Sequence, residues 1–226
     1  MKTKFLLIAL FPTLLIGCKY QSNPTKVEYD SYVVDFSSFD LAGKTLLQSS
    51  DGTFKEKVQS YISSKCENCV QDIEYSDGNK IKIAKDTFPA KLGETQALVL
   101  ASQNYDGFLS VTFTKKLASV KVQAQQYYNI AAGYSGDPHN YPYYDCQIYD
   151  EESSSYVADK NAALNVNDKK MHIDCVTYEY NSYGYPEIVI PPVCEETIKI
   201  NSTTLKLEAL ASYRMRVFEL TLYFAR

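Results

Sequence analysis

Six cysteines are the residues of this 226-residue chain with the widest range of chemistry. Cys66 and Cys69 form a Cys-x-x-Cys pair, a spacing that suits thiol redox chemistry when it lies at a helix N-terminus, where the dipole lowers a thiol pKa. This pair instead follows a predicted helix, and no β-α-β pattern surrounds it. We therefore expect a structural disulfide or plain thiols. A zinc site that adds two later cysteines is the alternative, although no second Cys-x-x-Cys marks it.

Two further cysteines lie in segments that echo each other. The run Tyr144–Asp150 around Cys146 resembles the run Ile173–Glu179 around Cys175, and both are predicted strands with their cysteines on the same face. A Cys146–Cys175 bridge is our preferred pairing, with Cys194 as the alternative partner. Connectivity does not follow from sequence. Leaving aside Cys18, five cysteines remain, so at least one is free or pairs with another molecule.

Tyrosine is the most over-used residue, with 20 Tyr against 10 Phe and no Trp. Many of these rings crowd the segment from Tyr127 to Asp145, where glycines, prolines and the absence of periodicity predict a long loop. Tyr rings can stack on sugar C–H faces, and neighbouring polar groups can bind hydroxyls. The candidate ligand-binding residues are Tyr127, Tyr128, Tyr134, Asp137, His139, Asn140, Tyr141, Tyr143 and Tyr144.

Two observations weigh against a simple glycan site. Trp, the largest stacking platform, is absent, and abundant tyrosines also pack on sheets in proteins that bind nothing. Asp137, Asn140 and Asp145 offer oxygen ligands of the kind that a structural calcium ion prefers, but their spacing fits no known calcium loop. We expect no other metal and no cofactor.

Catalytic arrangements are nearly absent. The chain has two histidines, His139 in the loop and His172 inside an alternating strand. Gly133–Asp137 misses the G-x-S-x-G pattern at its last position. The pairs Glu151–Glu152 and Glu195–Glu196 place adjacent side chains on opposite faces of a strand, so neither makes a two-carboxylate hydrolase site. We expect a protein that is not an enzyme; a hydrolase on a jelly-roll scaffold is the alternative.

The N-terminus is predicted to be a targeting segment. Lys2 and Lys4 precede the 12-residue apolar run Phe5–Ile16, which is too short to span a membrane and is interrupted by Pro12. The run ends in Leu-Ile-Gly-Cys at Cys18, which resembles a bacterial lipobox. The resemblance implies cleavage before Cys18 and a diacylglycerol on its sulfur, and thus an extracytoplasmic protein held on a membrane by lipid. The alternative is an ordinary secretory signal with a chance cysteine.

Three regions follow from this assignment: a signal peptide over 1–17, a lipidated polar tether over 18–32 and a domain over 33–226. In the domain, Thr53–Ser64 has capping-box spacing and an apolar stripe, which predict a short amphipathic helix. Ile73–Tyr75 and Lys80–Ile83 flank a turn and predict a hairpin. The run Ala97–Tyr128, with a break at Lys115–Lys116, predicts a β-meander. These and later alternating segments predict a mainly β fold, an antiparallel β-sandwich.

The strands Ala97–Ser102, Gly107–Phe113 and Ser119–Val122, with the Leu-Tyr-Phe run near the C-terminus, carry a second resemblance. They are similar to strands of galactose-binding-domain-like jelly rolls in bacterial surface proteins. The resemblance covers Gln96–Arg226 and implies a jelly-roll-like binding module, but its motifs are structural, so no binding residues carry over.

Charge limits the partners. The net charge of −4 becomes −6 when Lys2 and Lys4 leave with the signal peptide. The sequence shows no basic stripe, so we expect no nucleic-acid partner. We expect a lipid-anchored surface protein with a non-catalytic binding role. The ligand we expect is a carbohydrate, recognised through the Tyr-rich loop. The alternative is a structural or adhesive lipoprotein that contacts another protein.

Overall fold

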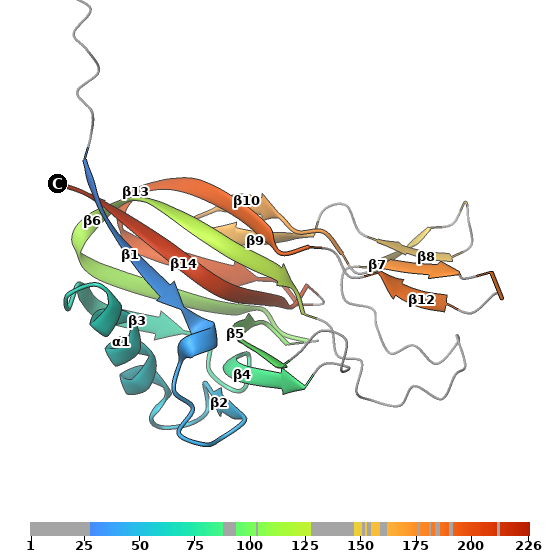
Figure 1. Cartoon of the computed structure of the whole chain (residues 1–226), viewed down its shortest axis with the longest axis horizontal. Coiled ribbons are helices and arrows are strands. Elements are labelled where there is room, and N and C mark those ends of the chain that lie inside the picture. Colours follow the sequence, from blue (N-terminus) through green and yellow to red (C-terminus); the bar gives the residue numbers. More distant parts are fainter. Residues whose placement is uncertain are drawn as a thin grey trace, which may run out of the picture.

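The structure is a computed structural model of the chain. It describes residues 28–87, 94–102, 104–127, 147–150, 152, 155–158, 162–175, 177–180, 182–183, 186–189, 192–211 and 213–226. Over these residues the chain is mainly β with one α-helix (Figure 1). The elements, in order, are β1 (Tyr29–Asp35), η1 (Phe36–Ser38), β2 (Leu46–Gln48), α1 (Phe54–Lys65), β3 (Val70–Tyr75), β4 (Ile81–Thr87), β5 (Glu94–Leu100), β6 (Gly107–Gln126), β7 (Gln147–Asp150), β8 (Ser155–Ala158), β9 (Ala163–Val166), β10 (Lys169–His172), β11 (Thr177–Tyr180), β12 (Pro186–Val189), β13 (Cys194–Ala209) and β14 (Met215–Ala225).

Ten of these strands form one antiparallel sheet. Its main path runs β10-β9-β13-β6-β14-β5-β4-β2, while β1 pairs with β14 and β3 pairs with β6. The remaining strands form two separate hairpins, β7 with β8 and β11 with β12. Both hairpins are insertions: the first lies between β6 and β9, and the second between β10 and β13.

The longest strand, β6, bends the sheet over its own core. Its first half, up to Phe113, pairs with β3 and the end of β13, whereas its second half, from Leu117, pairs with β14 and the start of β13. Register shifts in β13 between Lys199 and Thr204 mark the same bend, as expected where bulges turn a strand. Figure 1 shows β6 curving back at one side of the molecule.

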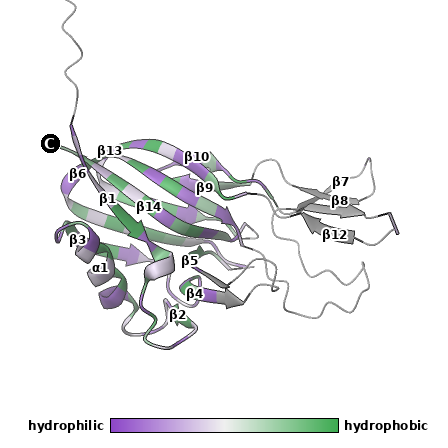
Figure 2. Cartoon of the chain, viewed as in Figure 1, coloured by the Kyte–Doolittle hydropathy of each residue, from purple (hydrophilic) through white to green (hydrophobic). Residues whose placement is uncertain are grey.

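The two layers made by this bend enclose one apolar core. Inward residues of both halves of β6 alternate with polar ones, which Figure 2 shows as alternating bands. Phe113, from one layer, meets Phe224, from the other, with ring centroids 5.4 Å apart. Helix α1 closes one side by burying Phe54, Val58 and Ile62. The core spans Val34 to Phe224, so a chain that starts at Glu28 contains all of it.

The mainly β fold with one short helix near the N-terminus is confirmed. The two separate sheets of a jelly-roll sandwich are not, because the main strands here belong to one continuous, bent sheet. The helix begins after Thr53 as expected, but the Thr53 side chain makes no cap hydrogen bond. Its φ of −99° and ψ of 0° are not the extended values of a capping residue, so the predicted capping box is wrong.

Three pairings predicted from local sequence are also corrected. β3 and β4 flank a turn, with Gly78 and Asn79 at positive φ, yet β3 pairs with β6 and β4 pairs with β5 and β2. The β-meander is wrong because β14 separates β5 from β6. The break at Lys115–Lys116 is a bend within one 20-residue strand. The tether is shorter than predicted, since Tyr29–Tyr32 already pair with Leu222–Ala225.

Candidate functional site

The bent sheet has two ends, which we call the bend end and the open end. The bend end holds the turn of β6 at Lys115–Leu117, and β14 ends and β1 begins beside it. The open end holds Gly107 and Gln126 at the two termini of β6, together with the start of β14. Leu117 and Gln126 are nine residue steps apart along β6, and at ~3.3 Å a step the two ends are separated by about 30 Å.

Tyr127 is the one predicted ligand-binding residue that the structure describes, and it lies at the open end. Its side chain is 4% exposed and packs with Ala84 and Val99. The ring centroid lies 5.1 Å from Nζ of Lys82 and 4.8 Å from Cζ of Arg214. Its backbone N–H donates to the Arg214 carbonyl at 2.8 Å. Tyr127 is therefore a buried anchor at the root of the Tyr-rich loop, and its ring is covered.

A second arginine lies in β14, two residues after Arg214, which itself precedes the strand. Arg216 is 2% exposed, donates from Nη2 to the Gln125 side-chain oxygen at 2.8 Å, and its Cζ lies 5.3 Å from the Phe218 ring centroid. The sequence analysis predicted neither the contact of Lys82 and Arg214 with Tyr127 nor the burial of Arg216. The i, i+2 spacing of the two arginines, which is the period of a strand face, was the available signal.

The other ligand-binding candidates lie outside the described residues: Tyr128, Tyr134, Asp137, His139, Asn140, Tyr141, Tyr143 and Tyr144. The predicted calcium ligands Asp137, Asn140 and Asp145 also lie there. Within the part of the chain that the structure describes, no three His, Cys, Asp or Glu side chains gather as a metal site would require. The glycan and calcium hypotheses for this loop remain predictions.

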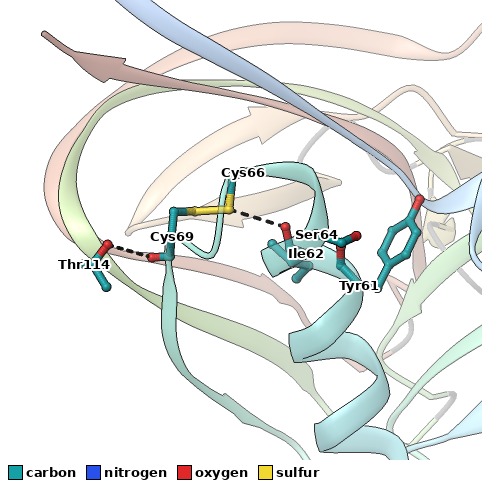
Figure 3. The surroundings of a disulfide bond; sticks show 6 residues. All are labelled: Tyr61, Ile62, Ser64, Cys66, Cys69 and Thr114. Atoms are coloured by element: carbon teal, nitrogen blue, oxygen red, sulfur yellow. Dashed lines mark hydrogen bonds between the residues drawn. A yellow bond between two sulfur atoms is a disulfide. The ribbon is translucent and has the colours of Figure 1, made fainter.

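Cys66 and Cys69 are joined by a disulfide just after helix α1 (Figure 3). Both are buried, at 2% and 7% exposure. The Cys66 sulfur lies 3.3 Å from the Ile62 carbonyl oxygen. A disulfide sulfur has no proton to donate, so this contact becomes an S–H···O hydrogen bond only after reduction. That bond and the negative end of the helix dipole would both disfavour a thiolate.

Hydrogen bonds connect the turn that holds the disulfide to the bend of β6. The Cys69 carbonyl accepts from the Thr114 backbone N–H at 2.8 Å and from its hydroxyl at 3.2 Å. The two sulfurs, being bonded to each other, do not act as zinc-binding thiolates in this state. Burial, position and hydrogen bonds all assign a structural role to this pair.

A small cavity of about 50 Å³ lies beside the disulfide, lined by Asp30, Tyr32, Cys66, Glu67, Cys69, Thr114, Lys115 and Phe224. Desolvation raises the pKa of the Tyr32 phenol, and the Glu67 carboxylate raises it further. Ligand-binding pockets are usually ~300–1,000 Å³, so this space is too small for a sugar.

The remaining predicted residues are dispersed. Cys146 lies outside the described residues, so the Cys146–Cys175 pairing stays a prediction. Cys175 is partly buried against the core. Cys194 is a free, half-buried thiol whose sulfur lies 4.0 Å from Oδ2 of Asp174. His172 lies on the exposed strand β10, where its Nε2 is 3.3 Å from Oδ1 of Asp174.

Comparison with known proteins adds no relative: no family model, no curated protein and no solved structure matches the chain. Among the residues described here, no helix has the length and apolar character needed to cross a membrane. The function must therefore be argued from the chain itself.

Proposed function

We propose that the protein is a lipoprotein, anchored through Cys18 on the extracytoplasmic side of a membrane, that binds carbohydrate through its Tyr-rich loop. The observation that carries the proposal is the arrangement of the two ends of the sheet. The chain enters the domain at the bend end, at Tyr29, and leaves β6 for the Tyr-rich loop at the open end, at Tyr127. The sheet therefore separates the point where the tether enters the domain from the point where the loop leaves β6.

The short tether strengthens this geometry. Ten residues lie between Cys18 and Tyr29, which reach at most ~35 Å when fully extended. An acylated Cys18 would tie the bend end, and not the open end, to the membrane within that reach. A binding loop rooted at the open end would then face soluble or cell-surface polymers.

The root of the loop is rigid, which suits a binding role. Tyr127 is held by its backbone bond to Arg214 and by the cations on its ring, at the end of the central strand β6 of a ten-stranded sheet. A fixed root lowers the conformational entropy that a loop loses when it binds. Tyr side chains then supply flat apolar faces with few rotatable bonds.

A glycan array with residues 28–226 tests the proposal. We expect binding to a defined class of sugar by the wild-type domain and loss of that binding in a Tyr143→Ala, Tyr144→Ala double variant. Tyr29→Ala is the matched control, because Tyr29 is an exposed tyrosine, 46% accessible, at the opposite end of the sheet. Circular dichroism checks that each variant is folded.

The outcomes separate the two candidate roles. A folded domain that binds no glycan would refute carbohydrate recognition and favour the adhesive lipoprotein, to be sought by pull-down from the cell surface. Binding that survives the double variant but not Tyr29→Ala would move the site away from the loop.

A further inference from the structure

Lysines gather at the bend end although the chain as a whole is acidic. Lys115 and Lys116 are exposed on the turn of β6. Across the sheet, Lys199 precedes the bend of β13, and the Lys169 ammonium donates to the Lys199 carbonyl. Glu67 lines the same small cavity as Lys115, and Arg226 lies just after β14 beside Glu28 and Asp30.

The carboxylates of Asp30 and Glu28 share one cation at this end. Arg226 binds Asp30 at 2.6 Å and Glu28 at 3.2 Å. Lys115 and Lys116, by contrast, make no ion pair with any residue that the structure describes. These two exposed lysines therefore carry positive charge that no ion pair within the described chain offsets.

The outer face of the same strands has the opposite sign nearer the open end. Glu195 and Glu219 lie on β13 and β14 on either side of Gln123. One of them, Glu195, is paired with Lys121 at 3.2 Å. The cations of the open end, Lys82, Arg214 and Arg216, are engaged with Tyr127 and Gln125. The unpaired lysines on the turn of β6 are therefore the cations available to attract a negatively charged plane.

We propose that the bend end docks on anionic phospholipid headgroups, with Lys115 and Lys116 as the main contacts. This inference rests on the proposed lipid anchor in one respect: the anchor determines which membrane the domain meets. The anchor would bring the lysines to the surface, and each lysine near an anionic bilayer adds about 1 kcal/mol of attraction. Docking would fix the sheet upright and hold the open end away from the bilayer.

Vesicle co-sedimentation tests the docking without the anchor. The chain is residues 28–226, which contain the whole core and lack Cys18. We expect binding to phosphatidylcholine vesicles that contain phosphatidylglycerol, no binding to pure phosphatidylcholine, and loss of binding at high salt. Lys115→Ala with Lys116→Ala should weaken the binding by about tenfold or more, from the charge attraction of two lysines.

The matched control removes the same charge elsewhere. Lys44→Ala with Lys80→Ala takes two lysines from the turn before β2 and the loop before β4, away from the bend, and should leave binding within about twofold, as expected for charges beyond a Debye length from the surface. Equal loss in both pairs, equal binding to neutral vesicles, or no binding at all by the folded wild-type domain would each overturn the proposal. Because Cys18 is absent from this chain, none of these outcomes depends on lipidation.

Discussion

At the residue scale, the Cys66–Cys69 disulfide closes a turn with an unfavourable backbone. The two residues inside it, Glu67 and Asn68, have φ values of 54° and 61°, which L-residues adopt at a cost. Replacing both cysteines by Ala should lower the free energy of unfolding by about 2 kcal/mol, the chain-entropy value for so short a loop. Urea denaturation measures this loss.

Reduction provides the control for that prediction. Dithiothreitol should lower the Tm of the wild type by more than it lowers the Tm of the double variant. Cys194→Ala should behave as the wild type, since Cys194 is a free thiol. Equal sensitivity of the double variant to dithiothreitol would place the important disulfide elsewhere in the chain.

Gly107 occupies a position that no side chain can share. A Cβ there would lie 2.3 Å from the Ala101 nitrogen and 2.4 Å from the Lys80 carbonyl oxygen. Both are backbone atoms held in the sheet, so they cannot move aside as a flexible side chain would. Gly107→Ala should destabilise the fold by about 2–3 kcal/mol, the usual cost of overpacking. Urea denaturation measures this loss of stability, with Gly52→Ala as the control because a Cβ at Gly52 meets nothing within 4 Å. An equal loss of stability in the two variants would contradict the close approach at Gly107.

The surroundings of a residue could be predicted from the sequence only where residues close to it in the chain form those surroundings. The Cys-x-x-Cys pair was placed after a helix because the apolar stripe of α1 ends just before it. The covered ring of Tyr127 was not predicted, because the cations that flank it come from β4 and from the residue before β14, far away in the sequence.

At the element scale, an ion pair joins helix α1 to strand β3. Nζ of Lys55 lies 2.7 Å from Oδ1 of Asp72. The hydrogen bond from Lys55, followed by one from the Ile73 backbone, lowers the pKa of Asp72 below its ordinary value. A carboxyl whose pKa is depressed in the folded state stabilises the fold above its unfolded pKa, and that contribution is lost as pH falls through the folded pKa.

Lys55→Met should raise the pKa of Asp72 while leaving it depressed by the Ile73 amide. A carboxyl ¹³C NMR titration of the wild type and the variant measures the shift. Lys57→Met is the control, since it removes a lysine from the same helix without touching this pair. An unchanged pKa of Asp72 in Lys55→Met would show that the pair does not persist in solution.

Alternation along the chain predicted the strands but not their partners. A period-two pattern shows which residues of a strand face the core. In β6 this pattern is interrupted by exposed residues at the bend, so one 20-residue strand resembles two short strands in the sequence. Pairing depends on distant segments: β14 inserts between β5 and β6, and β6 separates β3 from β14. Turn residues such as Gly78 and Asn79 indicate a reversal of the chain without requiring that the flanking strands pair.

At the scale of the whole molecule, the bend converts one sheet into a support with two different ends. The chain enters at the basic bend end and leaves for its insertions at the open end: the Tyr-rich loop and the hairpin β7–β8 follow β6, and β11–β12 precedes β13. Any membrane attachment through the segment before Tyr29 would present these insertions on the far side of the sheet.

The most direct test of this account is mass spectrometry of the mature N-terminus in the membrane fraction of producing cells. We predict a chain that begins at Cys18 and carries diacylglycerol on its sulfur, and loss of membrane association in Cys18→Ala. The lipid would place the bend end at the membrane and the Tyr-rich loop away from it. A mature chain that begins at another residue, or an unmodified Cys18 in a secreted protein, would contradict the account.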